Sequence, residues 1–144
     1  MHAGAALEPD LASRATNEAA SNPRYQWVGD LPRWQALRLL ARCRLMVLSS
    51  RMEGGANALS EALAAHVPVV CSKVDGTIGL LGDDYPGYFT VGDTQALAGL
   101  LRRAETDRPF YASLTARCRA AAPLVDPARE KRGWRDLLRE CGAD

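Results

Sequence analysis

Two glutamates and a glycine pair stand close together in the stretch 49–72, SSRMEGGANALSEALAAHVPVVCS. Glu53 comes directly before Gly54 and Gly55, and Glu61 lies within the first turns of a helix expected to begin after the glycines. Glycine allows a ligand to approach the backbone closely. The first N–H groups of a helix lack intrahelical partners and, with the helix dipole, favour phosphate. The stretch therefore has the composition of an anion-binding loop.

The two carboxylates indicate hydroxyl groups as further partners. Helical side chains tilt toward the helix N-terminus, so Glu61 is expected to point back toward the same opening as Glu53. A nucleotide sugar carries hydroxyls at both ends and a diphosphate between them, which suits this arrangement. The simpler interpretation is a solvated loop acid at Glu53, a first-turn acid at Glu61 and a helix cap at Asn57. Taken alone, the spacing favours the simpler interpretation.

The elements that position this stretch are predicted to alternate between strand and helix. The apolar run 44–50 ends in small polar residues, which is typical of a strand buried on both faces. A helix is predicted over 57–66 and a second buried strand over 67–72. The segment 75–87 is rich in glycine and turn residues, and its first part, 75–82, is expected to form a loop or a short 3₁₀ turn. Further strands are predicted over 24–29 and 88–93, and further helices over 8–20, 31–43, 94–105, 108–122 and 127–141.

This alternation predicts an α/β fold, a Rossmann-like three-layer sandwich with a mainly parallel sheet, in a single domain spanning 1–144. Ligands of such sheets bind beyond the carboxyl ends of the strands, which is where the stretch 49–72 lies. A doubly wound domain usually opens with a buried strand, and residues 1–6 are too short and too weakly apolar to form one. We therefore expect a piece of a longer protein that lacks its first strand.

Composition excludes several classes of function. The net charge of +1 gives no electrostatic basis for binding nucleic acid, and no apolar run has the length of a membrane span. The wide spacing of Cys43, Cys71, Cys118 and Cys141 argues against a metal site or a disulfide framework. We expect a cytoplasmic protein without a metal or cofactor. The tryptophans are expected to pack in the core or between helices: Trp27, Trp34 and Trp134.

The frame E-G-G-A-N-A-L-S-E-A, with Glu53 and Glu61 at its ends, resembles the Glu-x7-Glu motif of group 1 (family 4) glycosyltransferases, retaining enzymes of the GT-B fold. VPVVCS stands where that family has G-x-P-V-V-A-S. The resemblance covers roughly residues 24–141 and matches the carboxyl-terminal, nucleotide-sugar-binding half of such an enzyme. It implies that the amino-terminal, acceptor-binding half is absent and is supplied by the same natural chain or by a partner subunit.

The resemblance also assigns roles to residues. Glu53 would act on the donor sugar as the catalytic residue, and Glu61 would bind the ribose hydroxyls. The backbone between them would contact the sugar and the diphosphate at Gly54, Gly55, Ala56, Asn57 and Ala58. The family usually supplies an Arg and a Lys at the beginning of this domain, and HAGAALEP has neither, so the candidate phosphate contacts are Arg51 and Lys73. The candidate residues of a loop on the sugar side are Gly76, Thr77 and Gly79.

Together these features predict a bacterial hexosyltransferase that moves a sugar, with retention, from a nucleoside diphosphate sugar to an acceptor. The fragment alone is expected to be inactive, and its helix at 126–141 is expected to pack toward the missing half. The alternatives are a non-catalytic nucleotide-binding or interaction module and a GT-B nucleotide-sugar epimerase. The base, the sugar and the acceptor stay open, and an acceptor at the membrane surface would suit the full enzyme.

Overall fold

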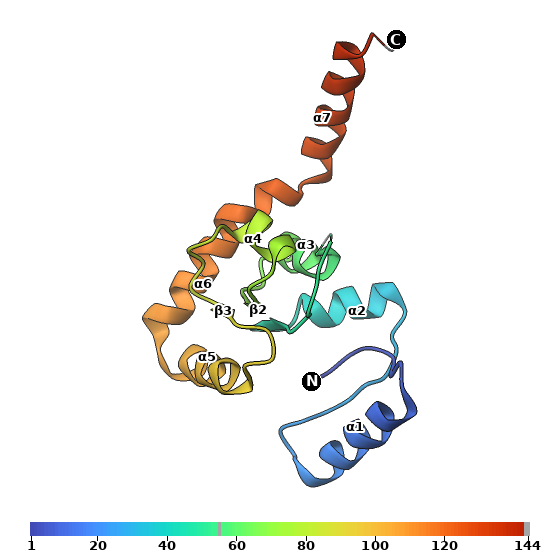
Figure 1. The fold of residues 1–144 in the computed structure, drawn as a ribbon, viewed down its shortest axis with the longest axis vertical. Coiled ribbons are helices and arrows are strands. Elements are labelled where there is room, and N and C mark those ends of the chain that lie inside the picture. The colour runs from blue at the N-terminus through green and yellow to red at the C-terminus, as the bar shows by residue number, and fades with distance from the viewer. Residues whose placement is uncertain (55, 143–144) are drawn as a thin grey trace. The chain divides into compact units, whose positions relative to one another are not determined.

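The computed structural model describes residues 1–54 and 56–142, which form two compact units (Figure 1). The first unit spans Met1–Leu39 and the second begins at Leu40. Gly55, one of the predicted binding residues, lies outside the described residues. In the part of the chain that the structure describes, no helix combines the length and apolar character needed to cross a membrane.

The first unit contains two helices and one parallel bridge. Its helices are α1 (Pro9–Ser21) and the greater part of α2 (Arg33–Leu40). The strand predicted over 24–29 is wrong, because the structure has only an isolated bridge between His2 and Trp27. The His2 N–H donates to the Gln26 carbonyl at 2.7 Å, and the Val28 N–H donates to the His2 carbonyl at 2.9 Å. The Gly4 N–H also donates to the Gly29 carbonyl at 2.8 Å, but among the described residues of 24–29 only Trp27 is part of a bridge.

The second unit is built on a parallel sheet of three strands in the order β1-β2-β3. The strands are β1 (Met46–Leu48), β2 (Val69–Ser72) and β3 (Tyr88–Phe89). Every residue of β2 is buried, as predicted. The expected burial of the run 44–50 on both faces is wrong, because Val47 is 41% exposed. Among the described strands β1 pairs only with β2, so one of its edges has no neighbouring strand.

The described part of the second unit also contains six helical segments, and several of them begin with an aspartate cap. They are α3 (Asn57–Ala64), α4 (Asp75–Leu81), α5 (Thr94–Thr106), α6 (Arg108–Ala121), the 3₁₀ helix η1 (Ala122–Val125) and α7 (Pro127–Glu140) (Figure 1). The carboxylates of Asp93, Asp107 and Asp126 accept hydrogen bonds from N–H groups in the first turns of α5, α6 and α7. Such caps satisfy donors that a helix start leaves unpaired. Both α5 and α6 contact β2.

The helix α4 replaces the loop expected at the start of the segment 75–87. The Thr77 hydroxyl accepts a hydrogen bond from the Val74 N–H at 3.2 Å and donates to the Ser72 carbonyl at 2.9 Å. These bonds fix the first turn to the end of β2, and Leu81 is buried at the other end of the helix. The glycine content therefore gave the wrong prediction, because a buried threonine and an apolar face outweigh the low helix propensity of glycine.

The core joins α3, β2 and α6. Its largest fully buried side chains are Leu59, Leu63, Leu114, Val69, Val70, Thr77, Cys71, Cys118 and Ser72. Trp27 is half-buried, and its indole N–H donates to the Gly4 carbonyl at 3.0 Å. The packing role expected for Trp34 and Trp134 is wrong within the described residues, since each is 58% exposed.

Candidate functional site

A cavity of about 620 Å³ lies where β1 and β2 end. Its described lining residues are Glu53, Gly54, Ala56, Asn57, Ser60, Asp75, Gly76, Gly79 and Leu80. The first five follow β1 and lead into α3, and the other four belong to α4, which follows β2. Parallel strands end at the same edge of a sheet, so two segments far apart in sequence meet here.

The beginning of α3 opens on this cavity. Ala56 and Asn57 both line it, and Ala56 is 4% exposed. The Ala56 carbonyl already accepts the first helical hydrogen bond, from the Ser60 N–H at 2.8 Å. The N–H groups of the first turn have no partner within the helix, and the helix dipole adds partial positive charge. This end of the cavity is therefore suited to an anionic group.

Glu53 is fixed from two sides. The Ser50 hydroxyl donates to Glu53 Oε1 at 2.5 Å, and the Ser50 carbonyl accepts from the hydroxyl of buried Ser72 in β2. On the other side, the Glu53 backbone lies directly against Gly76 in α4, where an added Cβ would be 2.4 Å from the Glu53 carbonyl oxygen. Only glycine at position 76 allows this close approach. The glutamate is therefore positioned by both strand ends at once.

The structure brings only part of the predicted site together. Among the predicted residues, those lining the cavity are Glu53, Gly54, Ala56, Asn57, Gly76 and Gly79. The described lining does not include Ala58, Glu61, Thr77, Arg51 or Lys73. Thr77 is completely buried, and its hydroxyl is engaged in the cap of α4. Glu61 is half-buried, one residue beyond Ser60. The binding roles of these residues stay predictions.

Lys73 forms an ion pair outside the cavity. Its Nζ lies 2.7 Å from Asp83 Oδ1 and 5.8 Å from the centre of the Tyr88 ring. Burial raises the pKa of Tyr88 to about 12, so this phenol is neutral at physiological pH. The Lys73 charge is therefore balanced by Asp83, and a role on phosphate would require it to leave that carboxylate.

Sequence reasoning missed Ser60, Asp75 and Leu80, which also line the cavity. Asp75 had a detectable signal, because it follows the buried strand 67–72 just as Glu53 follows 44–50. Polar residues directly after buried parallel strands meet at one edge of the sheet. With Asp75 included, the described lining holds two carboxylates and no basic side chain.

The two buried cysteines of the second unit, Cys71 and Cys118, are not nucleophilic thiols at neutral pH. Cys71 is buried in β2, and burial raises its pKa to about 12. Burial also raises the pKa of Cys118, whose Sγ lies 3.3 Å from the Tyr85 hydroxyl. Both thiols are therefore protonated at neutral pH, and the thiolate is the nucleophilic form. Across the described residues, no three His, Cys, Asp or Glu side chains form a group suited to a metal ion.

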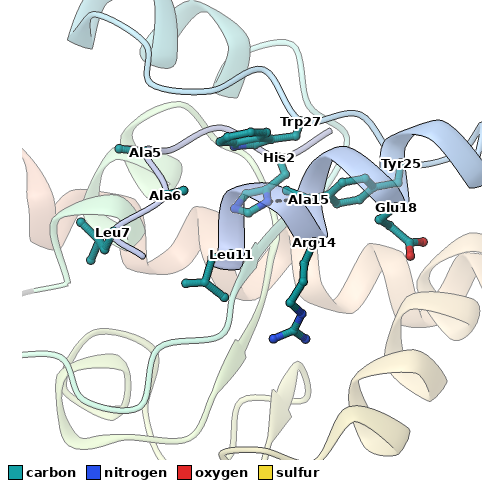
Figure 2. Close-up of a pocket in the computed structure, with 10 residues that line it drawn as sticks. All are labelled: His2, Ala5, Ala6, Leu7, Leu11, Arg14, Ala15, Glu18, Tyr25 and Trp27. Carbon is teal, nitrogen blue, oxygen red and sulfur yellow. Dashed lines mark hydrogen bonds between the residues drawn. The ribbon is translucent and has the colours of Figure 1, made fainter. Parts of the chain in front are cut away.

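A second cavity, of about 470 Å³, lies within the first unit (Figure 2). It is lined by His2, Ala5, Ala6, Leu7, Leu11, Arg14, Ala15, Glu18, Tyr25 and Trp27. His2 Nδ1 and the Tyr25 hydroxyl are 2.7 Å apart and form the hydrogen bond drawn in Figure 2. None of the predicted site residues lines this cavity.

Comparison with known proteins gives one family and one fold. The model of the family "Glycosyl transferases group 1" matches residues 4–123. TuaC of Bacillus subtilis (strain 168), a curated protein whose name describes a glycosyltransferase of teichuronic acid biosynthesis, is 35% identical over 80 residues. Those residues are 56% of this chain and 21% of TuaC.

Several solved structures share the fold of this chain over nearly its whole length. HepE of Anabaena in complex with UDP and glucose matches with a TM-score of 0.79 and 22% identity, over 96% of this chain and 39% of HepE. HepE with UDP-glucose matches with a TM-score of 0.77 and 23% identity. The GtfA/B complex gives a TM-score of 0.75 at 19% identity, over 99% of this chain and 29% of that chain. The likeness confirms the predicted α/β class and the GT-B fold, and the chain spans less than half of these relatives.

Proposed function

Since this chain belongs to the group 1 glycosyl transferases, we propose that its cavity at the ends of β1 and β2 binds a nucleoside diphosphate sugar for transfer to an acceptor. One observation carries the proposal. Glu53, Gly54, Ala56 and Asn57, which belong to the predicted motif, line the same cavity as the start of α4. HepE was solved with UDP and with UDP-glucose, which makes UDP the nucleotide to test first.

The proposed roles follow from the chemistry of each group. The diphosphate lies at the N-terminus of α3, against the backbone of Gly54, Ala56 and Asn57, where unpaired N–H groups and the dipole favour negative charge. Glu53 accepts hydrogen bonds from sugar hydroxyls and keeps its orientation through the Ser50 hydroxyl. Glu61, one turn into α3, binds the ribose hydroxyls of the nucleotide.

The same geometry explains how transfer would be assisted. Negative charge grows on the leaving diphosphate as the bond to the sugar breaks. Fixed N–H donors that point at this charge stabilise the transition state more than the ground state. The N-terminus of α3 provides such donors, and Glu53 positions the sugar for reaction on one face. We propose transfer with retention of the anomeric configuration, as in the family that the motif resembles.

Transfer also requires an acceptor site, which we propose lies on another domain or subunit. The helix α7 is exposed along its whole length, including Trp134, Leu137 and Leu138 at 58%, 47% and 49%. Their spacing places them on one face of the helix. We propose that this apolar face packs against the acceptor-binding half. The chain spans 39% of HepE, which leaves room for such a half in a longer protein.

A non-catalytic binding module is the second candidate function. One observation favours it, because neither Glu61 nor any basic side chain is among the described lining residues. A module of this kind would bind a nucleotide or another protein without transferring a sugar.

Titration calorimetry of the purified chain with UDP, GDP and ADP tests the donor-site proposal. We expect one nucleotide to bind, and Glu61→Ala to weaken it by about tenfold or more, a loss of ~1.4 kcal/mol. Glu140→Ala is the matched control, because Glu140 lies on α7 and outside the cavity. If no nucleotide binds the folded chain, or if the two variants behave alike, the proposal fails.

A further inference from the structure

The charged side chains among the described lining residues of the cavity are all acidic. Glu53 and Asp75 both line it, and no described lining residue is basic. Arg51 is exposed and is not among the described lining residues, and Lys73 is paired with Asp83 at 2.7 Å. Among the described residues that line the cavity, the compensating positive charge comes from the N-terminus of α3, which the diphosphate would occupy under the proposed function.

We infer that this cavity selects a donor with an uncharged sugar and rejects a uronate, and that Asp75 determines this selectivity. The inference rests on the proposed function, because it names the class of sugar bound at the same site. An uncharged hexose offers hydroxyl donors to both carboxylates. A uronate adds a third negative charge beside Glu53 and Asp75, which is repulsive.

The Asp75 carboxylate has oxygen atoms that can accept hydrogen bonds from a ligand, as this role requires. It is the first residue of α4, it is exposed, and its carboxylate has no hydrogen-bonding or ion-pairing partner among the described residues. Glu53 differs, because Oε1 already accepts a hydrogen bond from the Ser50 hydroxyl. An ionised carboxylate accepts several hydrogen bonds. The Asp75 carboxylate is therefore available to sugar hydroxyls.

An acid in the first turn of a helix also has an ordinary structural role, because it interacts favourably with the dipole. That role would affect the stability of α4 and the binding of every ligand in the same way. It would not change the preference between two ligands that differ only in the charge of the sugar. The preference is therefore the quantity to measure.

UDP-glucose and UDP-glucuronate form the required pair, because they differ only at C6 of the sugar. Both are titrated into the full chain by calorimetry, in buffer with EDTA so that no metal bridges the carboxylates, with UDP as reference. We expect UDP-glucose to bind about tenfold or more tightly than UDP-glucuronate. Asp75→Asn is expected to reduce that ratio below about threefold. Asp136→Asn, which removes the same charge from α7, is expected to leave the ratio unchanged.

The outcomes separate the two proposals. Equal affinities for the two sugars, or a ratio that Asp75→Asn changes no more than Asp136→Asn does, would overturn the inference and leave nucleotide binding intact. Failure of UDP and both UDP-sugars to bind the folded chain would overturn the proposed function, and the inference with it.

Discussion

Replacing Gly76 with alanine is expected to weaken the binding of UDP-glucose by about tenfold or more, a loss of ~1.4 kcal/mol. The added Cβ would lie 2.4 Å from the Glu53 carbonyl oxygen and 3.0 Å from the Glu53 Cβ. Backbone atoms do not yield like a flexible side chain, so the loop that carries Glu53 must move. That movement separates the glutamate from the cavity at which the sugar hydroxyls are expected to bind.

Gly79→Ala provides a matched control for this prediction. Gly79 lies in the same helix and lines the same cavity, but a Cβ added there meets nothing within 4 Å. Calorimetry should therefore give Gly79→Ala an affinity closer to that of the natural chain than to that of Gly76→Ala. Circular dichroism and urea denaturation show whether both variants fold. Equal affinities for two folded variants would contradict the proposed positioning of Glu53.

Gly87→Ala is expected to lower the free energy of unfolding by about 2 kcal/mol. A Cβ at this position would lie 2.7 Å from Tyr85 Cε1, 2.8 Å from the Val69 carbonyl oxygen and 2.9 Å from Leu114 Cδ2. These atoms belong to the buried core, and the Val69 carbonyl also accepts the hydrogen bond of the Tyr85 hydroxyl. The extra methyl group therefore strains the core, because it would point into packed atoms and not into solvent.

Gly99→Ala, unlike Gly87→Ala, is expected to raise the free energy of unfolding. Gly99 is exposed within α5, and a Cβ there meets nothing within 4 Å. Alanine in the middle of an exposed helix is more favourable than glycine by about 0.5–1 kcal/mol. Urea denaturation of both variants would measure the two effects. A Gly87→Ala variant as stable as Gly99→Ala would show that the core near Gly87 is looser than the structure indicates.

Much of this fold was predictable from local pattern. The run 67–72 contains the fully buried strand β2, and the predicted helices correspond to α1, α2, α3, α5, α6 and α7. The motif around Glu53 could be identified directly, because glycines after an apolar run and acids at fixed spacing are visible in the sequence. These features depend on neighbouring residues, which a single sequence displays.

The errors involve contacts that residue types alone do not display. The helix α4 depends on the bond from the Thr77 hydroxyl to the Ser72 carbonyl. The segment 24–29, predicted as a strand, forms only an isolated bridge between Trp27 and His2. Val47 is exposed although it lies in an apolar run, and β1 has one described neighbouring strand. The place of Asp75 in the cavity follows from the sheet, which brings the ends of β1 and β2 together. None of these relations is evident from the residue types alone.

A crystal structure of the chain with UDP-glucose tests the central claim most directly. We expect the diphosphate against the backbone of Gly54, Ala56 and Asn57 at the start of α3, with the glucose between Glu53 and Asp75. The ribose is expected on the side of Glu61. A nucleotide sugar bound instead in the cavity of the first unit, beside His2 and Tyr25, would contradict the assignment of the site.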